Sequence, residues 1–237
     1  MHFLHIEAEM HYIAILHHIF LTLDTELAGL AHAGLASEGH IVVILDYLGT
    51  DKSLLEVGMD DTGTHAREGA GEEVAAEVDP HTWTSVRNVK KMASNMYEAM
   101  VDIDPSNKGY YARRFKTFIQ SLDSLDMALD SILRPCRGAS FVVWHPSLSY
   151  FARDYGLHQI ALSPEGKEMS VEDISRAVER ARRDSARVMF FQKDADSRQA
   201  QTVNDQIGAR VVEINPLDYD WKGEMLNIAN AMASDSQ

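Results

Sequence analysis

The sequence has little that would cross-link it or carry it into a membrane. Cys136 is the only cysteine among 237 residues, which excludes an internal disulfide and a cysteine-based zinc cluster. No apolar run reaches the length of a membrane span. The opening residues, MHFLHIEAEM, lack the basic start and unbroken apolar core of a signal peptide, and no small-residue cleavage site follows. We therefore expect either a cytosolic chain or one whose targeting segment was removed or replaced.

Positive charge is scarce, above all before residue 80. The formal net charge of −14 argues against nucleic acid as a partner. Lys52 and Arg67 are the only basic side chains before residue 80, whereas eight of the 11 histidines lie there. An acidic, histidine-rich segment suits a cation, and a solubilising acidic surface is the alternative. Because 45% of the residues are hydrophobic, a folded core is expected, in one large domain or two small ones.

The first half of the chain is predicted to be mainly helical. Residues 3–35 are expected to be helical, 40–49 to form a buried strand, and 58–80 to form a loop. Two helices are expected next, over about 86–103 and 105–133. In the second, apolar residues from Tyr111 to Ile132 recur at alternating spacings of four and three, which predicts a helix roughly 40 Å long at 1.5 Å per residue.

Beyond residue 135, strand-like and helix-like segments alternate. The predicted strands are 140–145, 158–162, 187–192 and 210–215, and the predicted helices are about 148–155, 171–184, 196–207 and 221–233. This alternation predicts an α/β fold with a parallel sheet and helices on both faces. Ligands of such sheets bind beyond the carboxyl ends of the strands, where His145, Gln192 and Asn215 lie.

Two histidines next to prolines stand out as a candidate shared site. In VDPHTW, Pro80 stiffens the turn that should present His81 just before a helix, and His145 ends a strand before Pro146. If both bind one zinc ion, their nitrogens should lie roughly 3–4 Å apart. The alternatives are an ordinary loop histidine at 81 and a strand-end histidine at 145 that bonds to the backbone.

From DPHTW onward, the chain resembles the zinc- and manganese-binding solute receptors of bacterial ABC importers, the cluster A-I or ZnuA/TroA-like family. The resemblance covers about two-thirds of the chain. The matching segments are DPHTWTSVRNVKKMASNMYEAMVDIDPSNKGYYARRF, FVVWHPSLSYFARDYGLHQIAL, PEGKEMSVEDI and GARVVEINPLDYDW.

The resemblance implies two α/β lobes with parallel sheets, joined by a long rigid helix, with a metal cleft between the lobes. The corresponding division is an N-terminal lobe at 1–104 that contains the acidic loop 58–80, a linking helix at 105–134, and a C-terminal lobe at 135–237.

The resemblance also implies a set of metal ligands. His81 matches the histidine of the DPHxW motif, and His145 matches the ligand after the first strand of the second lobe. Asn215 stands where the family usually has a carboxylate, and its neutral amide oxygen is a weaker zinc ligand. Gln192, also at a strand end, is expected either to orient a ligand or contact a metal-bound water, or to be an ordinary polar residue that caps the strand.

The N-terminal part departs from the family. No early DPHxYEP-like segment supplies the usual first ligand, and His32, Glu38 and His40 are the nearest candidates by position. The acidic segment before DPHTW retains only one histidine, His65, so it is expected either to capture metal weakly or to be an ordinary solvated loop.

The resemblance implies a monomeric receptor that delivers Zn²⁺, or as second choice Mn²⁺, to an ABC permease. It would be periplasmic or anchored at the outer surface, and it would not be an enzyme. One alternative is an adhesion or binding module that kept the fold without high-affinity metal. Another is a zinc hydrolase, for which the sequence lacks a His-Glu-x-x-His motif.

Overall fold

The computed structural model describes Asp79 and residues 81–162, 171–192 and 197–234. The helix expected at 3–35, the strand at 40–49 and the loop at 58–80, apart from Asp79, lie outside the described residues. The chain divides into two compact units. Of the described residues, 86–126 belong to the first unit, and the rest belong to the second. The three-part division expected from the resemblance stays a prediction.

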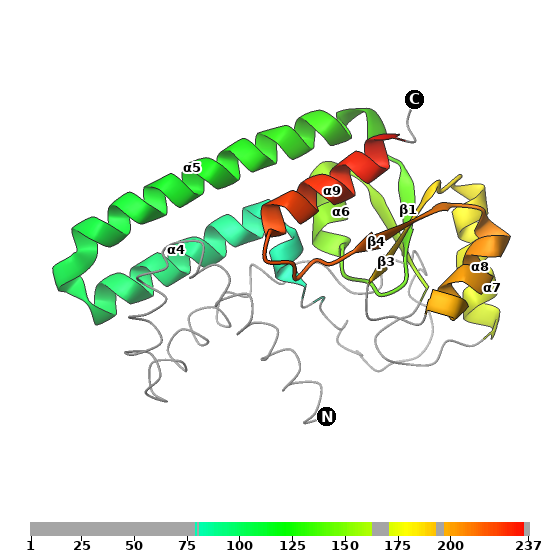
Figure 1. Ribbon diagram of the computed structural model, residues 1–237, viewed down its shortest axis with the longest axis horizontal. Coiled ribbons are helices and arrows are strands. Elements are labelled where there is room, and N and C mark those ends of the chain that lie inside the picture. Colours follow the sequence, from blue (N-terminus) through cyan, green and yellow to red (C-terminus); the bar gives the residue numbers. More distant parts are fainter. Residues whose placement is uncertain (1–78, 80, 163–170, 193–196, 235–237) are drawn as a thin grey trace, which may run out of the picture. The chain divides into compact units, whose positions relative to one another are not determined.

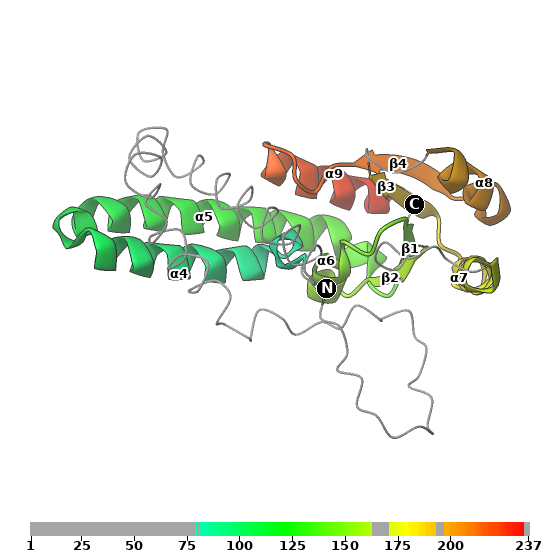
Figure 2. The same ribbon diagram turned by 90° about the horizontal axis from the view of Figure 1, so that it is seen from below.

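The described residues of the first unit form two helices connected by a short turn, and the second helix continues into the second unit. Helix α4, Val86–Ile103, and helix α5, Lys108–Leu133, lie side by side and are joined by the 3-10 turn η3, Pro105–Asn107 (Figures 1 and 2). Helices were expected over about 86–103 and 105–133, the second from its apolar periodicity; α4 has the expected bounds, and α5 begins at Lys108, after the 3-10 turn. The buried apolar residues of α4 recur at helical spacing: Val86, Val89, Met92, Ala93, Met96 and Ala99.

Lys90 joins the two helices electrostatically. Its amine lies 2.8 Å from a carboxylate oxygen of Asp123 and 3.1 Å from one of Asp126, both on α5. Burial lowers the pKa of Lys90, but the hydrogen bonds and charges of the two carboxylates outweigh this, so the pKa lies above its ordinary value. Farther along, the rings of Tyr97 and Phe115 stack with centroids 4.8 Å apart.

The turn between α4 and α5 is organised by Asp104. Its carboxylate accepts hydrogen bonds from the Ser106 hydroxyl at 2.5 Å, the Asn107 amide at 2.7 Å and the Tyr111 hydroxyl at 2.8 Å. These donors lower the pKa of Asp104 to about 2. Burial and then the hydrogen bond to Asp104 raise the pKa of Tyr111 to about 12. Pro105 begins the 3-10 turn, as the sequence predicts.

We expect Asp104→Asn to flatten the acid limb of the stability profile. A carboxylate with a depressed pKa stabilises the fold above its ordinary pKa of 3.8, and this contribution is lost as the pH falls through about 2. Between these values, the free energy of unfolding should fall more steeply in the wild type than in the variant. Urea unfolding over this range measures it, with Glu98→Gln on exposed α4 surface as the control. Identical slopes in the wild type and Asp104→Asn would contradict the prediction.

The second unit contains a four-stranded parallel sheet, which confirms the predicted fold class. The strands are β1 Ser140–Val143, β2 His158–Ala161, β3 Val188–Gln192 and β4 Arg210–Ile214. Their order is β2-β1-β3-β4, and every pair is parallel. Residues Phe141 to Val143 are buried on both faces of the sheet, as expected of a central strand between helical layers.

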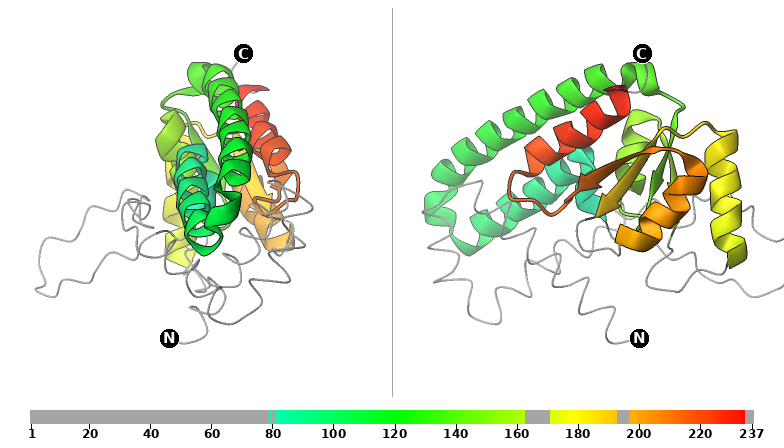
Figure 3. Two further views of the ribbon diagram at one scale, coloured as in Figure 1. Left: turned by 90° about the vertical axis from the view of Figure 1, so that its left-hand side faces the viewer. Right: turned by 45° about the vertical axis from the view of Figure 1, so that its right-hand side comes forward.

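Helices cover both faces of this sheet. They are α6 Ser149–Tyr155, α7 Val171–Arg183, α8 Ser197–Ile207 and α9 Trp221–Ser234, all close to their predicted positions. Helices α6 and α9 lie on one side, and α7 and α8 on the other (Figures 1 and 3). The core under α7 and α8 includes Val142, Ile160, Val178, Met189, Phe191 and Val203. Among the described residues, no helix combines the length and apolarity that a membrane crossing requires.

This topology places three candidate residues at one edge of the sheet. His145 follows β1, Gln192 ends β3 and Asn215 follows β4, and these three strands are consecutive neighbours. Strand β1 ends at Val143, two residues before its predicted end. The Trp144 N–H makes the last bond to β3, at 3.1 Å to the Phe190 carbonyl, and the chain then turns, with the Ser147 N–H bonded to the His145 carbonyl at 2.8 Å. Pro146, between these two residues, has no N–H that could continue the ladder.

Candidate metal centre

Asp79 and His81 form a compact turn immediately before the 3-10 turn η2, Thr82–Thr84. The Asp79 carboxylate oxygen Oδ1 accepts the backbone N–H of His81 at 2.9 Å. The His81 carbonyl in turn accepts the backbone N–H of Thr84 at 3.1 Å and its hydroxyl at 2.9 Å. A short hydrogen-bonded turn at His81 therefore lies just ahead of α4 in the sequence, as predicted, while Pro80 lies outside the described residues.

The same carboxylate fixes the imidazole of His81. Oδ1 of Asp79 lies 2.6 Å from Nδ1 of His81, and the Asp79 side chain is 0% exposed. Because an ionised carboxylate only accepts hydrogen bonds, this contact assigns the proton to Nδ1. The lone pair of Nε2 then points away from Asp79 and is available to a metal ion, as in carboxylate–histidine–zinc arrangements.

His145 meets His81 at that second nitrogen. The two Nε2 atoms lie 3.1 Å apart, and the rings cross at 78° with centroids 4.9 Å apart. Two Zn–N bonds of about 2.0–2.1 Å at a tetrahedral angle hold their nitrogens about 3.3 Å apart. The expected approach of the two imidazoles is thus confirmed, and the donor pair fits zinc in both spacing and chemistry.

Neutral side chains from two other strands hold the segment after His145. Gln192 on β3 donates to the Ser147 hydroxyl at 2.8 Å. Gln159 on β2 accepts the Leu148 N–H at 2.8 Å and donates to the Ser149 hydroxyl at 2.8 Å. Gln192 therefore contacts the peptide segment that carries His145, which is how a supporting residue orients a ligand.

The side chain of Asn215 takes part in the turn after β4. Its Oδ1 accepts the Leu217 N–H at 3.3 Å, and its Nδ2 donates to Asp218 at 3.3 Å. Its backbone N–H donates to Glu224 at 2.8 Å. Its hydrogen-bond partners among the described residues thus lie in the loop after β4 and at the start of α9. Its role as a metal ligand stays a prediction.

Within the described ranges, no group of three or more histidine, cysteine, aspartate or glutamate side chains converges as a metal cluster. The candidates for a first ligand, His32, Glu38 and His40, lie outside those ranges, as does the acidic segment with His65. The pair His81–His145, with Asp79 behind it, is therefore the part of the candidate centre that the described residues provide.

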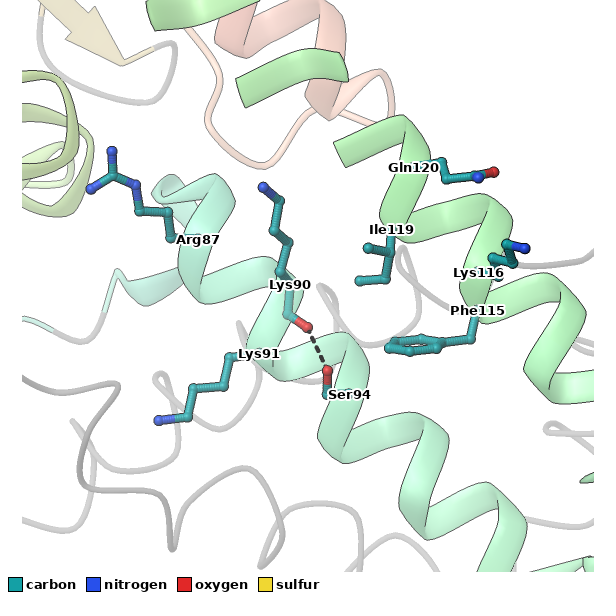
Figure 4. A pocket seen from close by; sticks show the side chains of 8 residues that line it. All are labelled: Arg87, Lys90, Lys91, Ser94, Phe115, Lys116, Ile119 and Gln120. Carbon is teal, nitrogen blue, oxygen red and sulfur yellow. Dashed lines mark hydrogen bonds between the residues drawn. The ribbon is translucent and has the colours of Figure 1, made fainter. Parts of the chain in front are cut away.

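A groove of ≈ 590 Å³ on the first unit is lined by basic, apolar and neutral polar side chains, unlike the histidine pair (Figure 4). It is lined by Arg87, Lys90, Lys91, Ser94, Phe115, Lys116, Ile119 and Gln120. Neither an imidazole nor a carboxylate lines it, so it does not suit a divalent cation. In Figure 4, the side chains of Arg87 and Lys91 extend away from Phe115 and Ile119 and do not converge with Lys90 on one point.

The sequence analysis did not identify Asp79, Gln159 or Tyr150 as parts of the site. A signal existed for Asp79, because an aspartate two residues before a histidine is able to bond to its backbone in an Asx turn. Gln159 lies 14 residues beyond His145, and Tyr150 donates to the Asp79 carbonyl across 71 residues of sequence. No local pattern reports such distant partners.

Known proteins match this chain over most of its length. The model of the family described as "ZnuA: Zinc-uptake complex component A periplasmic" matches residues 22–233. The high-affinity zinc uptake system protein ZnuA of Bacillus subtilis (strain 168) is 31% identical over 144 residues, which are 60% of this chain and 45% of that relative. The zinc-binding lipoprotein AdcA of Streptococcus pneumoniae (strain ATCC BAA-255 / R6) is 29% identical over 171 residues, 71% of this chain and 34% of that relative.

A crystal structure of ZnuA has the same fold, with a TM-score of 0.65 and 29% identity. The match covers 71% of this chain and 64% of that one. The chain thus spans less than half the length of the two curated relatives and less than two-thirds of the crystallised one. Since the family model covers well over half of the sequence, the chain belongs to the family of the zinc-uptake complex component A.

Proposed function

We propose that this chain is an extracytoplasmic receptor that binds Zn²⁺ and delivers it to an ABC permease. The observation that carries the proposal is the 3.1 Å separation of the Nε2 atoms of His81 and His145. Two imidazoles at this spacing, one of them backed by a buried carboxylate, make a pair of zinc donors. The names of the relatives, a zinc uptake system protein and a zinc-binding lipoprotein, support the choice of cargo.

Each residue has a distinct task in this proposal. His81 and His145 donate Nε2 lone pairs to the ion, and Asp79 keeps the His81 proton on Nδ1. Asn215 contributes its amide oxygen, which the bond to Leu217, long at 3.3 Å, holds only weakly. Gln192 does not bind the ion and instead holds the segment after His145 through its hydrogen bond to Ser147. A neutral amide in place of a carboxylate lowers affinity, which suits a receptor that must release its cargo.

The donor set favours zinc over manganese and binding over catalysis. Imidazole suits Zn²⁺, whereas Mn²⁺ prefers carboxylate, carbonyl and water oxygens, so Mn²⁺ is the second candidate. A zinc hydrolase needs a base near the metal-bound water. Among the described residues, the carboxylate that contacts the pair, Asp79, is already bonded to His81 at 2.6 Å. We therefore propose a monomeric receptor, periplasmic or anchored at the outer surface, and not an enzyme.

Calorimetric titration with Zn²⁺ and Mn²⁺ tests the proposal. We expect the wild type to bind zinc at a site that His81→Ala/His145→Ala removes, and to bind manganese more weakly. His158→Ala is the matched control, because this histidine is exposed at the start of β2, at the opposite edge of the sheet. Zinc binding of unchanged affinity and stoichiometry in the double variant would overturn the proposal. Stronger binding of manganese than of zinc would reassign the cargo.

A further inference from the structure

Tyr150 links the two histidine-bearing segments of the candidate centre. It lies on α6, five residues after His145, and its side chain is fully buried. Its hydroxyl donates a hydrogen bond of 2.7 Å to the backbone carbonyl of Asp79. The side chain of Asp79 holds His81, so a single phenol connects the segment of one imidazole to the segment of the other.

A second buried contact fixes the same two segments farther along. The Ser85 hydroxyl, just after η2, donates to the Asp154 carboxylate on α6. Arg153 bonds to the other oxygen of that carboxylate through Nε at 2.9 Å and Nη2 at 2.8 Å. Its guanidinium also lies 5.1 Å from the centre of the Tyr150 ring. The turn η2 is therefore held against α6 near both of its ends, and Tyr150 forms the end next to the imidazoles.

We infer that Tyr150 is a positioning residue of the metal centre, whose hydroxyl sets the separation of the His81 and His145 nitrogens. The inference rests on the proposed role of these histidines as zinc ligands. Tyr150 does not contact the ion. It acts through the Asp79 carbonyl, which places the Asp79 carboxylate, which in turn orients the His81 ring.

The hydroxyl matters because metal ligation tolerates little displacement. Metal–ligand distances in a working site stay within about 0.2 Å of their ordinary values. Without the phenol donor, the buried Asp79 carbonyl loses this hydrogen bond. Because an unsatisfied buried acceptor is costly, the backbone is expected to shift toward another donor or a water molecule. Such a movement carries Asp79 and His81 away from His145.

The test is Tyr150→Phe, which removes the hydroxyl and keeps the buried ring. We expect zinc affinity to fall by about tenfold, the lower end of the range for residues that orient metal ligands. Tyr155→Phe is the matched control, a buried tyrosine on the same helix whose ring packs on Phe151 with centroids 5.0 Å apart. Its zinc affinity should stay within about twofold of wild type, well below the shift expected of an orienting residue.

Two further measurements separate positioning from general structural support. Cobalt(II) bound in place of zinc reports ligand geometry, so its visible absorption spectrum should change in Tyr150→Phe and stay unchanged in Tyr155→Phe. Installing 4-aminophenylalanine at position 150 keeps a ring donor, and it should restore most of the affinity. This second variant also serves if Tyr150→Phe folds poorly.

The outcomes distinguish this inference from the proposed function. Wild-type zinc binding that depends on both histidines, together with unchanged binding by Tyr150→Phe, overturns the inference alone. A weakened Tyr150→Phe with an unchanged cobalt spectrum, or a failed rescue by the amine, overturns it as well. Zinc binding that does not depend on the two histidines overturns the proposed function and this inference with it.

Discussion

Zinc should raise the unfolding midpoint of the wild-type protein, and His81→Ala/His145→Ala should abolish that rise. An ion that binds the folded state alone stabilises it by about 4 kcal/mol when its free concentration is a thousandfold above the dissociation constant. The two Nε2 atoms lie 3.1 Å apart only in the folded chain, because 64 residues separate the histidines in sequence. Thermal unfolding with and without saturating Zn²⁺ measures the effect.

The control for this experiment is the metal-free midpoint of the double variant. His81→Ala also removes the ring donor of the buried Asp79 carboxylate, so the metal-free midpoint of the double variant should be lower than that of the wild type and serves as its own baseline. The comparison is between the zinc-dependent shifts of the two proteins. A zinc-dependent rise that survives the double substitution would show that zinc acts elsewhere in the chain. The eight histidines before residue 80 are the first place to look.

Asp79→Asn should weaken zinc binding by about 10–100-fold, the usual effect of losing a partner that orients a ligating histidine. The amide oxygen of asparagine is a weaker acceptor than a carboxylate, so it holds the Nδ1 proton of His81 less firmly. The variant also removes a negative charge that lies behind the ring and attracts the bound cation. Calorimetric titration of the variant beside wild type gives the affinity ratio.

The same substitution should leave metal-free stability unchanged or raise it. Asp79 is 0% exposed, and its Oδ2 is buried without a hydrogen-bond partner among the described residues. A buried charge with one unsatisfied oxygen destabilises the fold, and a neutral amide reduces that cost. Opposite changes in affinity and stability therefore mark Asp79 as a residue retained for its function.

Asp184→Asn is the matched control for Asp79→Asn. Asp184 accepts a hydrogen bond of 3.3 Å from the Ser140 hydroxyl, at the first residue of β1 and so at the edge of the sheet opposite His145. Its loss should leave zinc affinity unaltered. Equal losses of affinity in the two variants, or a large fall in metal-free stability for Asp79→Asn, would contradict the prediction.

Segments with strong periodicity were predictable because their pattern arises from nearby residues. The helix at 86–103 has the predicted bounds, and the apolar spacing from Tyr111 to Ile132 located α5. The parallel pairing of the strands was also predictable, since alternating strands and helices favour it. The end of β1 was placed too late, because β-forming residues continue to His145 while the ladder stops at Val143.

The candidate site was predictable at the level of its histidines and not of their supports. His81 and His145 each lie beside a proline, which marks them in the sequence. The bond from Tyr150 to Asp79 and the bonds from Gln159 to the loop after His145 form only when segments remote in sequence pack together. A phenol and an amide that make such contacts look like ordinary core and strand residues until the fold is known.

The hydrogen bonds that hold the segments of His81 and His145 should make the geometry of the centre insensitive to salt concentration. Apart from Asp79 and the contacts of Asp154 with Ser85 and Arg153, the groups that hold the two histidine-bearing segments are uncharged. They are the Tyr150 phenol, the Gln159 and Gln192 amides, and the Ser147 and Ser149 hydroxyls. Dissolved ions screen attraction between exposed charges over about 8 Å at physiological ionic strength, but they have little effect on buried hydrogen bonds between neutral groups. The arrangement of the two imidazoles should therefore be nearly the same in dilute and in concentrated salt solution, a useful property for the extracytoplasmic receptor proposed above.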